Sequence, residues 1–560
     1  MADRNPASSA GSPRFLRSAG IVSAAVALSR VTGLVREMVM ARLFGAGEVY
    51  DAFLLAFRIP NLTRDLFAEG ALSSAFVPTF TQYLTAKGRR QAAELSNLTA
   101  TMLLVVSGTV CLLGMVFSPA LVRMLAPGFQ QVPGKFELAV HLTRVMFPFL
   151  ALVALAAQAM GVLNACDRFG VPALSSVMFN VASVTVGLLL GYSIGRTFEQ
   201  GPIVCMAYGI VAGGLLQLLW QMPSLWREGF AYRPRWNPRH PGLRSIFRLM
   251  LPAFLGNAAV QINVMVNTNL ASGLTDASGH VINGPVSWLG YAFRFLQLPL
   301  GLFGVAIAAA TLPEISRSVA LGRMNEFSAA LVRSLRMTLF LAVPSSIGLA
   351  VLGRSMIGAV YQSGRFQAYD TRQTAAALAC YSVGLAGYSA IKLLAPAFYA
   401  LEDALTPMLV SVASIAVNLG AAVFFVKQLG MGHSGLALAT SSVALAGSIA
   451  LLTILAVRLR RARTPLDLRR LGASALRISA AGAVMAAVCR VSSNLVHAVL
   501  GAAKTAQLAD VALSIPLGAA VFCAAAHLAG CEEPKELWCA CYTAKRNASR
   551  PEVGGPPPGH

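Results

Sequence analysis

The chain has 560 residues, of which 56% are hydrophobic and only 12% are charged. Soluble domains carry about 25% charged residues, so this composition excludes an ordinary soluble protein and indicates a polytopic membrane protein. A net charge of +22 would suggest nucleic acid in a soluble chain. In a membrane protein it indicates Lys and Arg gathered in cytoplasmic loops, so we expect no nucleic-acid partner.

Apolar runs of about 20 residues, long enough to cross a bilayer as helices, follow one another along the chain. Because lipid offers no water to backbone groups, each run is expected to be helical, which predicts an all-α fold. We place fourteen spans near 19–41, 51–83, 98–123, 138–163, 172–194, 203–226, 246–272, 286–311, 328–352, 373–400, 408–427, 434–457, 474–494 and 507–530.

The second run is unusual because it carries charges inside an apolar span. Within DAFLLAFRIPNLTRDLFAEGALSSAFVPTF lie Asp51, Arg58, Arg64, Asp65 and Glu69, and Pro60 and Pro78 interrupt the run. A charge in hydrocarbon costs roughly 2.5–3.5 kcal/mol even on the lenient insertion scale, so these side chains are expected to face a wet cavity. The run is also too long for one straight crossing, so it should bend at Pro60 or extend past the membrane.

A faint internal repeat suggests how the spans are grouped. YDAFLLAFRIPNL at 50–62 is echoed by YAFRFLQLPLGL at 291–302, and each is followed by a second proline, in FVPTF and in TLPEIS. The echo pairs spans one to six with spans seven to twelve and predicts a binding site between two six-helix lobes. The predicted parts are a cytoplasmic lead (1–18), an N-lobe (19–230), a C-lobe (231–460), two further spans (461–530) and a disordered cytoplasmic tail (531–560).

Basic loops set the expected orientation. Loops rich in Lys and Arg follow spans two, six, eight and twelve, which all lie on one side when fourteen spans are counted, whereas the opposite loop 273–285 has neither residue type. The loop near 354–372 is an exception, with Arg354, Arg365 and Arg372. The positive-inside rule then predicts that both termini are cytoplasmic.

Five arginines lie inside the spans: Arg30 and Arg36 in the first, Arg58 and Arg64 in the second, and Arg294 in the eighth. Counted at about 1.5 Å per residue, they occupy a band from the outer half of the membrane towards its midplane. Each could pair with an acid such as Glu37 or Asp51 and merely join helices. The acids are too few for all of them, and the eighth span offers Arg294 none. Because guanidinium binds phosphate at two points, the excess of cation suggests a polyanionic headgroup such as a diphosphate.

Other polar features are less specific. The seventh span carries a stripe of amides that either faces the cavity or joins helices: Asn257, Gln261, Asn263, Asn267 and Asn269. The cysteines are scattered, and the tail residues Cys531, Cys539 and Cys541 with His527 fit no zinc pattern. No nucleotide, nucleophile or metal motif is visible, so we expect no cofactor and no metal site.

The segments SRVTGLVRE, FGAG, DAFLLAFRIPNLTRDLFAEGALSSAFVPTF and YAFRFLQLPLGLFGVAIAAATLPEIS resemble the MurJ (MviN) family of bacterial lipid II flippases. The resemblance covers nearly the whole chain and places it in the multidrug/oligosaccharidyl-lipid/polysaccharide exporter superfamily. It implies two six-helix lobes around a central cationic cavity, with two C-terminal helices whose groove holds the polyprenyl tail. It also implies a transporter without enzymatic activity, which moves lipid II from the inner to the outer leaflet of the bacterial cytoplasmic membrane by alternating access.

The resemblance also assigns residues. The essential cavity arginines of the family fall on Arg30, Arg36, Arg64 and Arg294, its functional aspartate falls on Asp51, and Glu37 and Arg58 match positions that are acidic and basic in relatives. We expect Arg36, Arg64 and Arg294 to grip the diphosphate with support from Arg30 and Arg58, while Asp51 and Glu37 orient them or form a gate. Some relatives bind sodium through an acid in the seventh span, where this chain has only amides.

The energy source, the oligomeric state and the alternative functions stay open at this stage. Membrane potential or a monovalent ion is the expected energy source, and a monomer surrounded by membrane lipids is the expected state. Other candidates are an exporter of another lipid-linked oligosaccharide and a drug/cation antiporter, although an antiporter would need cavity acids. A membrane enzyme acting on polyprenyl phosphates would need catalytic Asp or His at a membrane face and an extramembrane domain, and neither is visible.

Overall fold

The computed structural model describes residues 13–64, 73–195, 201–501 and 503–534, with the side chains of 13–23, 62–64, 73–74 and 251–257 left aside. This part of the chain is helical throughout, apart from loops and one isolated bridge between Thr275 and Val281. The predicted all-α class is therefore confirmed. Asp65 and Glu69, and the tail cysteines Cys539 and Cys541, lie outside the described residues.

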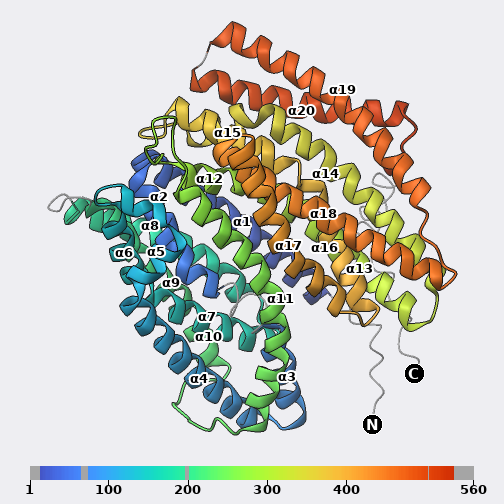
Figure 1. Cartoon of the computed structure of the whole chain (residues 1–560). Coiled ribbons are helices and arrows are strands. Elements are labelled where there is room, and N and C mark those ends of the chain that lie inside the picture. Colours follow the sequence, from blue (N-terminus) through green and yellow to red (C-terminus); the bar gives the residue numbers. More distant parts are fainter. Residues whose placement is uncertain (1–12, 65–72, 196–200, 502, 535–560) are drawn as a thin grey trace, which may run out of the picture. The chain divides into compact units, whose positions relative to one another are not determined.

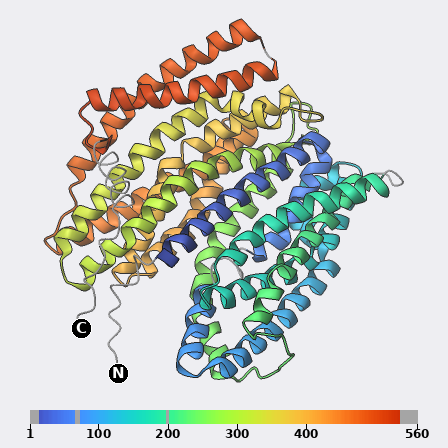
Figure 2. The same cartoon turned by 180° about the vertical axis from the view of Figure 1, so that it is seen from behind.

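Helices cover every one of the fourteen predicted spans in the described ranges (Figures 1 and 2). They are α1 (Pro13–Phe44), α2 (Glu48–Arg64), α3 (Ser73–Ala86), α4 (Arg89–Val116), α5 (Ser118–Leu125), α6 (Lys135–Met146), α7 (Pro148–Ala165), α8 (Gly170–Ser193), α9 (Gly201–Leu219), α10 (Met222–Arg227), α11 (Pro241–Ser272), α12 (Pro285–Pro299), α13 (Val305–Ala320), α14 (Met324–Tyr361), α15 (Ala368–Ser382), α16 (Leu385–Ala400), α17 (Leu405–Val423), α18 (Gly432–Arg461), α19 (Leu468–Leu500) and α20 (Lys504–Leu528).

Not every predicted span is independently long and apolar enough to cross a membrane. Ten are, and an eleventh is the pair α15 and α16, which is bent by 44°. The remaining three predicted spans are those of α1, of α2 with α3, and of α11. Helices α2 and α3 have only 17 and 14 residues, and α1 and α11 contain side chains outside the described part. A multi-span membrane protein is thus established, and the count of fourteen stays a prediction.

Prolines mark the two helices that echo each other in sequence. Pro60 lies inside α2, which continues to Arg64, and Pro299 ends α12 at a π-helical turn, Leu300–Gly304. Proline lacks the N–H that an α-helix needs, so the helix adjusts locally, and π turns of this kind recur at functional sites. Pro78 and Pro313 lie inside the helices that follow, α3 and α13.

The chain forms two compact units. The first comprises Met1–Tyr291, Val360–Thr374 and Ser411–Ala439, and the second comprises Ala292–Ala359, Ala375–Val410 and Thr440–His560. The first unit therefore includes short segments from the second half of the chain. The predicted division into lobes at residue 230 follows the internal repeat and not these contacts, so it stays a prediction, as does a cavity between lobes.

Small residues bring helices of the first unit close together. A Cβ at Gly209 of α9 would overlap the backbone oxygen of Ser183 in α8, and a Cβ at Gly213 would lie 2.8 Å from the oxygen of Phe179. Lipid tails are as apolar as Leu, so membrane helices gain by close packing at small residues. The fit of α8 against α9 places Phe179 and Asn180 next to α1.

The second unit has two apolar clusters. One contains Phe327 and Leu331 of α14 with Leu394 and Phe398 of α16 and Leu455 of α18. The other joins α14 to the C-terminal helix pair, which lies side by side in Figure 1, through residues Phe340, Leu352, Ile478, Met485 and Phe522. The last two helices therefore pack on α14, which holds them in the second unit.

Candidate functional site

Arg36 of α1 lies between two aromatic rings of the first unit. Its guanidinium carbon is 5.4 Å from the ring centroid of Phe179 in α8 and 6.0 Å from that of Phe57 in α2. Cations at this distance from an aromatic face are attracted by the ring quadrupole. The Arg36 side chain is 14% exposed, so it is held in place although not sealed from solvent.

Glu37 follows Arg36 on α1 and connects it to an aromatic group. The Arg36–Glu37 nitrogen–oxygen distance is 3.8 Å, which is longer than a hydrogen bond. The other carboxylate oxygen accepts a hydrogen bond from Tyr361 Oη at 3.1 Å. The Tyr361 ring packs on Tyr291, which stacks on Tyr50 at 5.0 Å. Glu37 is therefore a buried acid that faces Arg36 and, through Tyr361 and Tyr291, connects to Tyr50 at the start of α2.

The other predicted arginines have different surroundings. Arg30 is exposed on α1 and directly follows Ser29, whose backbone oxygen accepts a hydrogen bond from Asn180 Nδ2 at 3.2 Å. Arg58 of α2 donates to the Thr268 hydroxyl of α11. Arg64 is the last residue of α2, and its side chain lies outside the described part. The structure thus places Arg36 and Arg58 among contacts within the first unit.

Arg294 belongs to the second unit. It lies on α12, its side chain is exposed, and its Nη1 lies 3.4 Å from Oε1 of Gln297 one turn later. The π-helical turn at Leu300–Gly304 begins one residue after Pro299, so Arg294 precedes a local irregularity of the helix. Its expected role with the other arginines stays a prediction.

Asp51, in the first turn of α2, is buried and accepts four hydrogen bonds. They come from Lys135 Nζ at 2.9 Å, the Gly284 N–H at 2.8 Å, and the Ser287 N–H and hydroxyl at 2.9 and 2.6 Å. A carboxylate has about four lone-pair sites, so this one is fully used. Sequence reasoning missed Lys135, because the fourth span was placed from residue 138 and left this lysine in a loop.

Segments from the second half of the chain pack at the same end of the first unit. Trp288 Nε1 donates to Asp370 of α15 at 3.0 Å, and the Arg365 N–H donates to the Arg42 oxygen at 3.0 Å. His433 Nε2 lies 2.9 Å from the oxygen of Gln373. At the end that carries the loop between α1 and α2, the first unit is therefore tied together by contacts of segments from the second half of the chain with α1 and with one another.

The amides of α11 join helices. Asn263 Nδ2 donates to Ser414 at 2.8 Å, and Asn418 Nδ2 donates to Asn267 at 3.0 Å, so α11 is tied to α17. The oxygens Asn263 Oδ1 and Asn418 Oδ1 are buried without a hydrogen-bond partner in the described part. The sequence of α11 contains no acid. A sodium site built on a carboxylate of this helix does not fit these residues.

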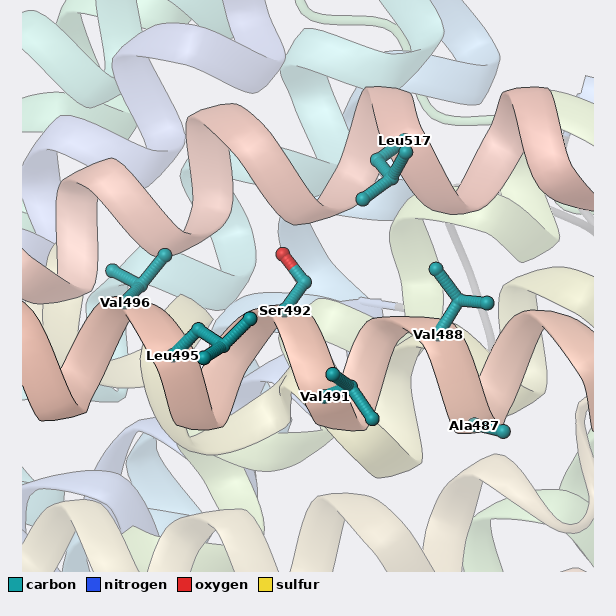
Figure 3. Close-up of a pocket in the computed structure, with 7 residues that line it drawn as sticks. All are labelled: Ala487, Val488, Val491, Ser492, Leu495, Val496 and Leu517. Atoms are coloured by element: carbon teal, nitrogen blue, oxygen red, sulfur yellow. The ribbon is translucent and has the colours of Figure 1, made fainter.

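An apolar pocket of about 430 Å³ lies between α19 and α20 (Figure 3). It is lined by Ala487, Val488, Val491, Ser492, Leu495, Val496 and Leu517. Figure 3 shows Leu517 of α20 above the side chains of α19. Its lining is almost wholly apolar, which suits a hydrocarbon chain. The pocket falls within residues 461–530, where the sequence resemblance implies a groove for a lipid tail.

The arrangement of helices has known counterparts among solved structures. A structure titled "Lipid II flippase MurJ, inward closed conformation" superposes with a TM-score of 0.72 at 24% identity, covering 89% of this chain and 97% of that one. An inward-facing MATE family multidrug transporter of the MOP superfamily gives 0.66 at 16% identity, covering 77% and 95%. Fold and buried charges thus define a multi-span membrane protein with the helical architecture shared by these transporters.

Sequence comparison narrows the class to one family. The family model described as "Lipid II flippase MurJ" matches residues 40–530. A probable lipid II flippase MurJ of Vibrio cholerae is 37% identical over 441 residues, 77% of this chain and 81% of the relative. A probable lipid II flippase MurJ of Bdellovibrio bacteriovorus is 32% identical over 523 residues, 93% of this chain and 96% of the relative. The chain belongs to the MurJ family.

Proposed function

We propose that this chain is a lipid II flippase, which carries the undecaprenyl-diphosphate-linked disaccharide-pentapeptide from the cytoplasmic to the periplasmic leaflet of the bacterial inner membrane. Membership in the MurJ family, through a match over residues 40–530, is the observation that carries the proposal. Members of this family are transporters, so the expected absence of enzymatic chemistry follows from membership. The same substrate class was suggested independently by the excess of arginine over acid in the spans.

The diphosphate is assigned to the arginines. Arg36 is best supported, because two aromatic rings orient its guanidinium and its acidic neighbour Glu37 is engaged with Tyr361. Guanidinium offers several donors in a rigid fork that matches phosphate oxygens. Arg64 and Arg294 are assigned as further phosphate ligands, and Arg30 and Arg58 as supporting cations, from the family resemblance.

The polyprenyl tail is assigned to the pocket between α19 and α20. Only the charged headgroup gains from a polar route across the membrane, whereas the tail is as apolar as lipid and gains from staying beside it. The lining of the pocket from Ala487 to Leu517 supplies the apolar wall that such a tail requires. Substrate transfer then proceeds by alternating access, with the headgroup inside and the tail outside the helical bundle.

Orientation and energy source are proposed from charge. Basic loops and the positive-inside rule support cytoplasmic termini, and a monomer is the proposed state. Membrane potential is the proposed energy source, since it acts on a net-charged carrier with about 2.3 kcal/mol per charge per 100 mV. The acid-free α11 supports this choice over sodium coupling. Flipping that continues unchanged after the potential is collapsed would contradict this part of the proposal.

The test is complementation in cells depleted of their own lipid II flippase. Wild type should restore growth, and Arg36→Ala should abolish rescue at normal membrane levels. Arg42→Ala is the matched control, because Arg42 lies on the same helix and is exposed. Failure of the well-expressed wild type would favour another lipid-linked oligosaccharide. Equal rescue by both variants would show that Arg36 only joins helices.

A further inference from the structure

The buried pair of Lys135 and Asp51 has no assigned role in transport. Lys135 is the first residue of α6, and both side chains of the pair are only 1% exposed. Nζ of Lys135 donates to Asp51 at 2.9 Å and to Asn283 Oδ1 at 2.8 Å, and it lies 4.2 Å from the ring centroid of Phe129. The ammonium group therefore donates two hydrogen bonds and also faces an aromatic ring.

The pair joins three parts of the first unit. Asp51 lies on α2, Lys135 begins α6, and the remaining partners Asn283, Gly284 and Ser287 lie at the start of α12. We call these five residues the Asp51 network. Two of its hydrogen bonds come from backbone N–H groups at the beginning of α12, where the helix dipole favours a negative charge. Both charges are saturated by protein, which leaves no site for substrate on them.

An ion pair is a poor choice for a permanent contact. Removing two charges from water costs solvation that their attraction only partly returns, so a packed apolar pair would hold the helices at least as well. A contact that opens to water is different, because both charges recover their hydration when they separate. The Lys135–Asp51 pair can therefore hold α12 against α2 and α6 while still allowing these helices to separate, because both charges are hydrated again when the pair opens.

The Asp51 network also lies at the start of α12, the helix whose movement would separate the pair. Helix α12 begins in the first unit and continues from Ala292 into the second unit, where it carries Arg294. Movement of the first turn of α12 away from α2 and α6 would break all the Asp51 contacts to α12. The network thus fixes one end of a helix that is predicted to contact substrate through its other half.

We propose that Lys135 is the positioning residue of a latch: it neutralises Asp51 and holds it on the start of α12 while this end of the protein is closed, and the pair separates when this end opens. The inference rests on the proposed function, because opening of this end is a step of alternating access. It adds a buried cation, and a reason for its burial, to the gate expected at Asp51.

The experiment measures how often this end opens in intact cells. In a full-length chain whose nine native cysteines are replaced by alanine, Val286→Cys serves as the reporter, since Val286 is 2% exposed and precedes Ser287. In the proposed orientation this end faces the periplasm, so a membrane-impermeant maleimide labels the cysteine only when this end opens. Lys135→Met should raise the labelling rate about tenfold or more, because the closed state then buries an unpaired carboxylate. Lys135→Arg should stay close to the parent.

The double variant Asp51→Asn/Lys135→Met separates a latch from a mere packing role. It removes both charges, so its labelling should be no faster than in the parent. Labelling of Lys135→Met within about twofold of the parent, or a double variant as fast as Lys135→Met, would overturn the inference. If Lys135→Met does not reach the membrane, the double variant decides alone, and labelling above the parent overturns the latch. Labelling needs no substrate, so a chain that labels as expected but fails complementation contradicts only the flippase assignment.

Discussion

The C-terminal end of the second unit offers a stability prediction with an internal control. Arg336 of α14 is 6% exposed and donates through Nε to Glu533 at 2.8 Å, and Glu533 is 1% exposed. Ser474 of α19 donates to the same carboxylate. The neighbouring Glu532 lies at the surface, where it pairs with Arg470, whose side chain is 57% exposed. Arg336 also donates through Nη2 to Glu532 at 3.1 Å, so the buried Arg336 pairs with both acids of the segment after α20, whereas Arg470 pairs with the exposed Glu532.

Arg336→Met should destabilise the protein by about 3–5 kcal/mol, because it leaves the Glu533 carboxylate buried without its cation. Arg470→Met is the matched control and should have a much smaller effect, since water screens the exposed pair. The double variant Arg336→Met/Glu533→Leu should recover most of the loss, because it removes the orphaned charge. The measurement is thermal unfolding of the purified protein in detergent, followed by tryptophan fluorescence.

The pH dependence of unfolding gives a second readout of the same pair. Burial raises the pKa of Glu533, but the hydrogen bonds from Ser474 and Arg336 outweigh it and hold the pKa below its ordinary value of 4.5. Stability from this group is therefore present above pH 4.5 and is lost as the pH falls through the lower folded-state pKa. Without Arg336, burial favours the protonated carboxyl more strongly, so the destabilisation caused by Arg336→Met should shrink as the pH falls. Equal unfolding temperatures for Arg336→Met and Arg470→Met across this range would refute the reasoning.

Three further predictions concern transport and packing. Arg36→Lys should keep the charge but lose most of the rescue, because an ammonium group cannot reproduce two-point phosphate binding, and complementation at matched membrane levels checks this. Val491→Trp should fill the pocket between α19 and α20 and reduce rescue, whereas Leu476→Trp on the exposed face of α19 should not, and equal rescue would remove the tail assignment. Gly209→Val should abolish membrane accumulation, because its side chain would overlap the Ser183 backbone, and accumulation at wild-type level would contradict the packing of α8 on α9.

The sequence was sufficient to predict the helices because each apolar run has one physical solution in lipid. The π turn after Pro299 was not predicted, although that proline was noted in the internal repeat. The bend at Pro60 or extension past the membrane stays a prediction, because α2 continues to Arg64 and the next eight residues lie outside the described part. Span boundaries followed hydropathy, which explains why a charged first residue such as Lys135 was assigned to a loop.

The sequence could not predict which charges meet. Asp51 was correctly singled out as unusual, yet its partner lies 84 positions away at the start of another helix. Likewise Glu37 lies 3.8 Å from Arg36, as an orienting acid would, but its hydrogen bond from Tyr361, in a segment 324 positions away, was not predicted. Such pairings depend on how helix ends assemble, and hydropathy along one chain carries no information on that.

The two acids of the site differ in a way that separates their roles. Asp51 accepts four hydrogen bonds and is sealed, so a phosphate could reach its surroundings only after the Asp51 network has opened. Glu37 stands 3.8 Å from Arg36, a distance at which attraction is electrostatic and not a hydrogen bond, so a diphosphate can compete for the same guanidinium. Between them lie the stacked rings of Tyr50 and Tyr291, and Tyr50 precedes Asp51 in the chain. Under the proposed function, binding at Arg36 and opening of the Asp51 network therefore act on one continuous set of contacts, and a double-mutant cycle between Arg36 and Lys135 would measure the coupling between them.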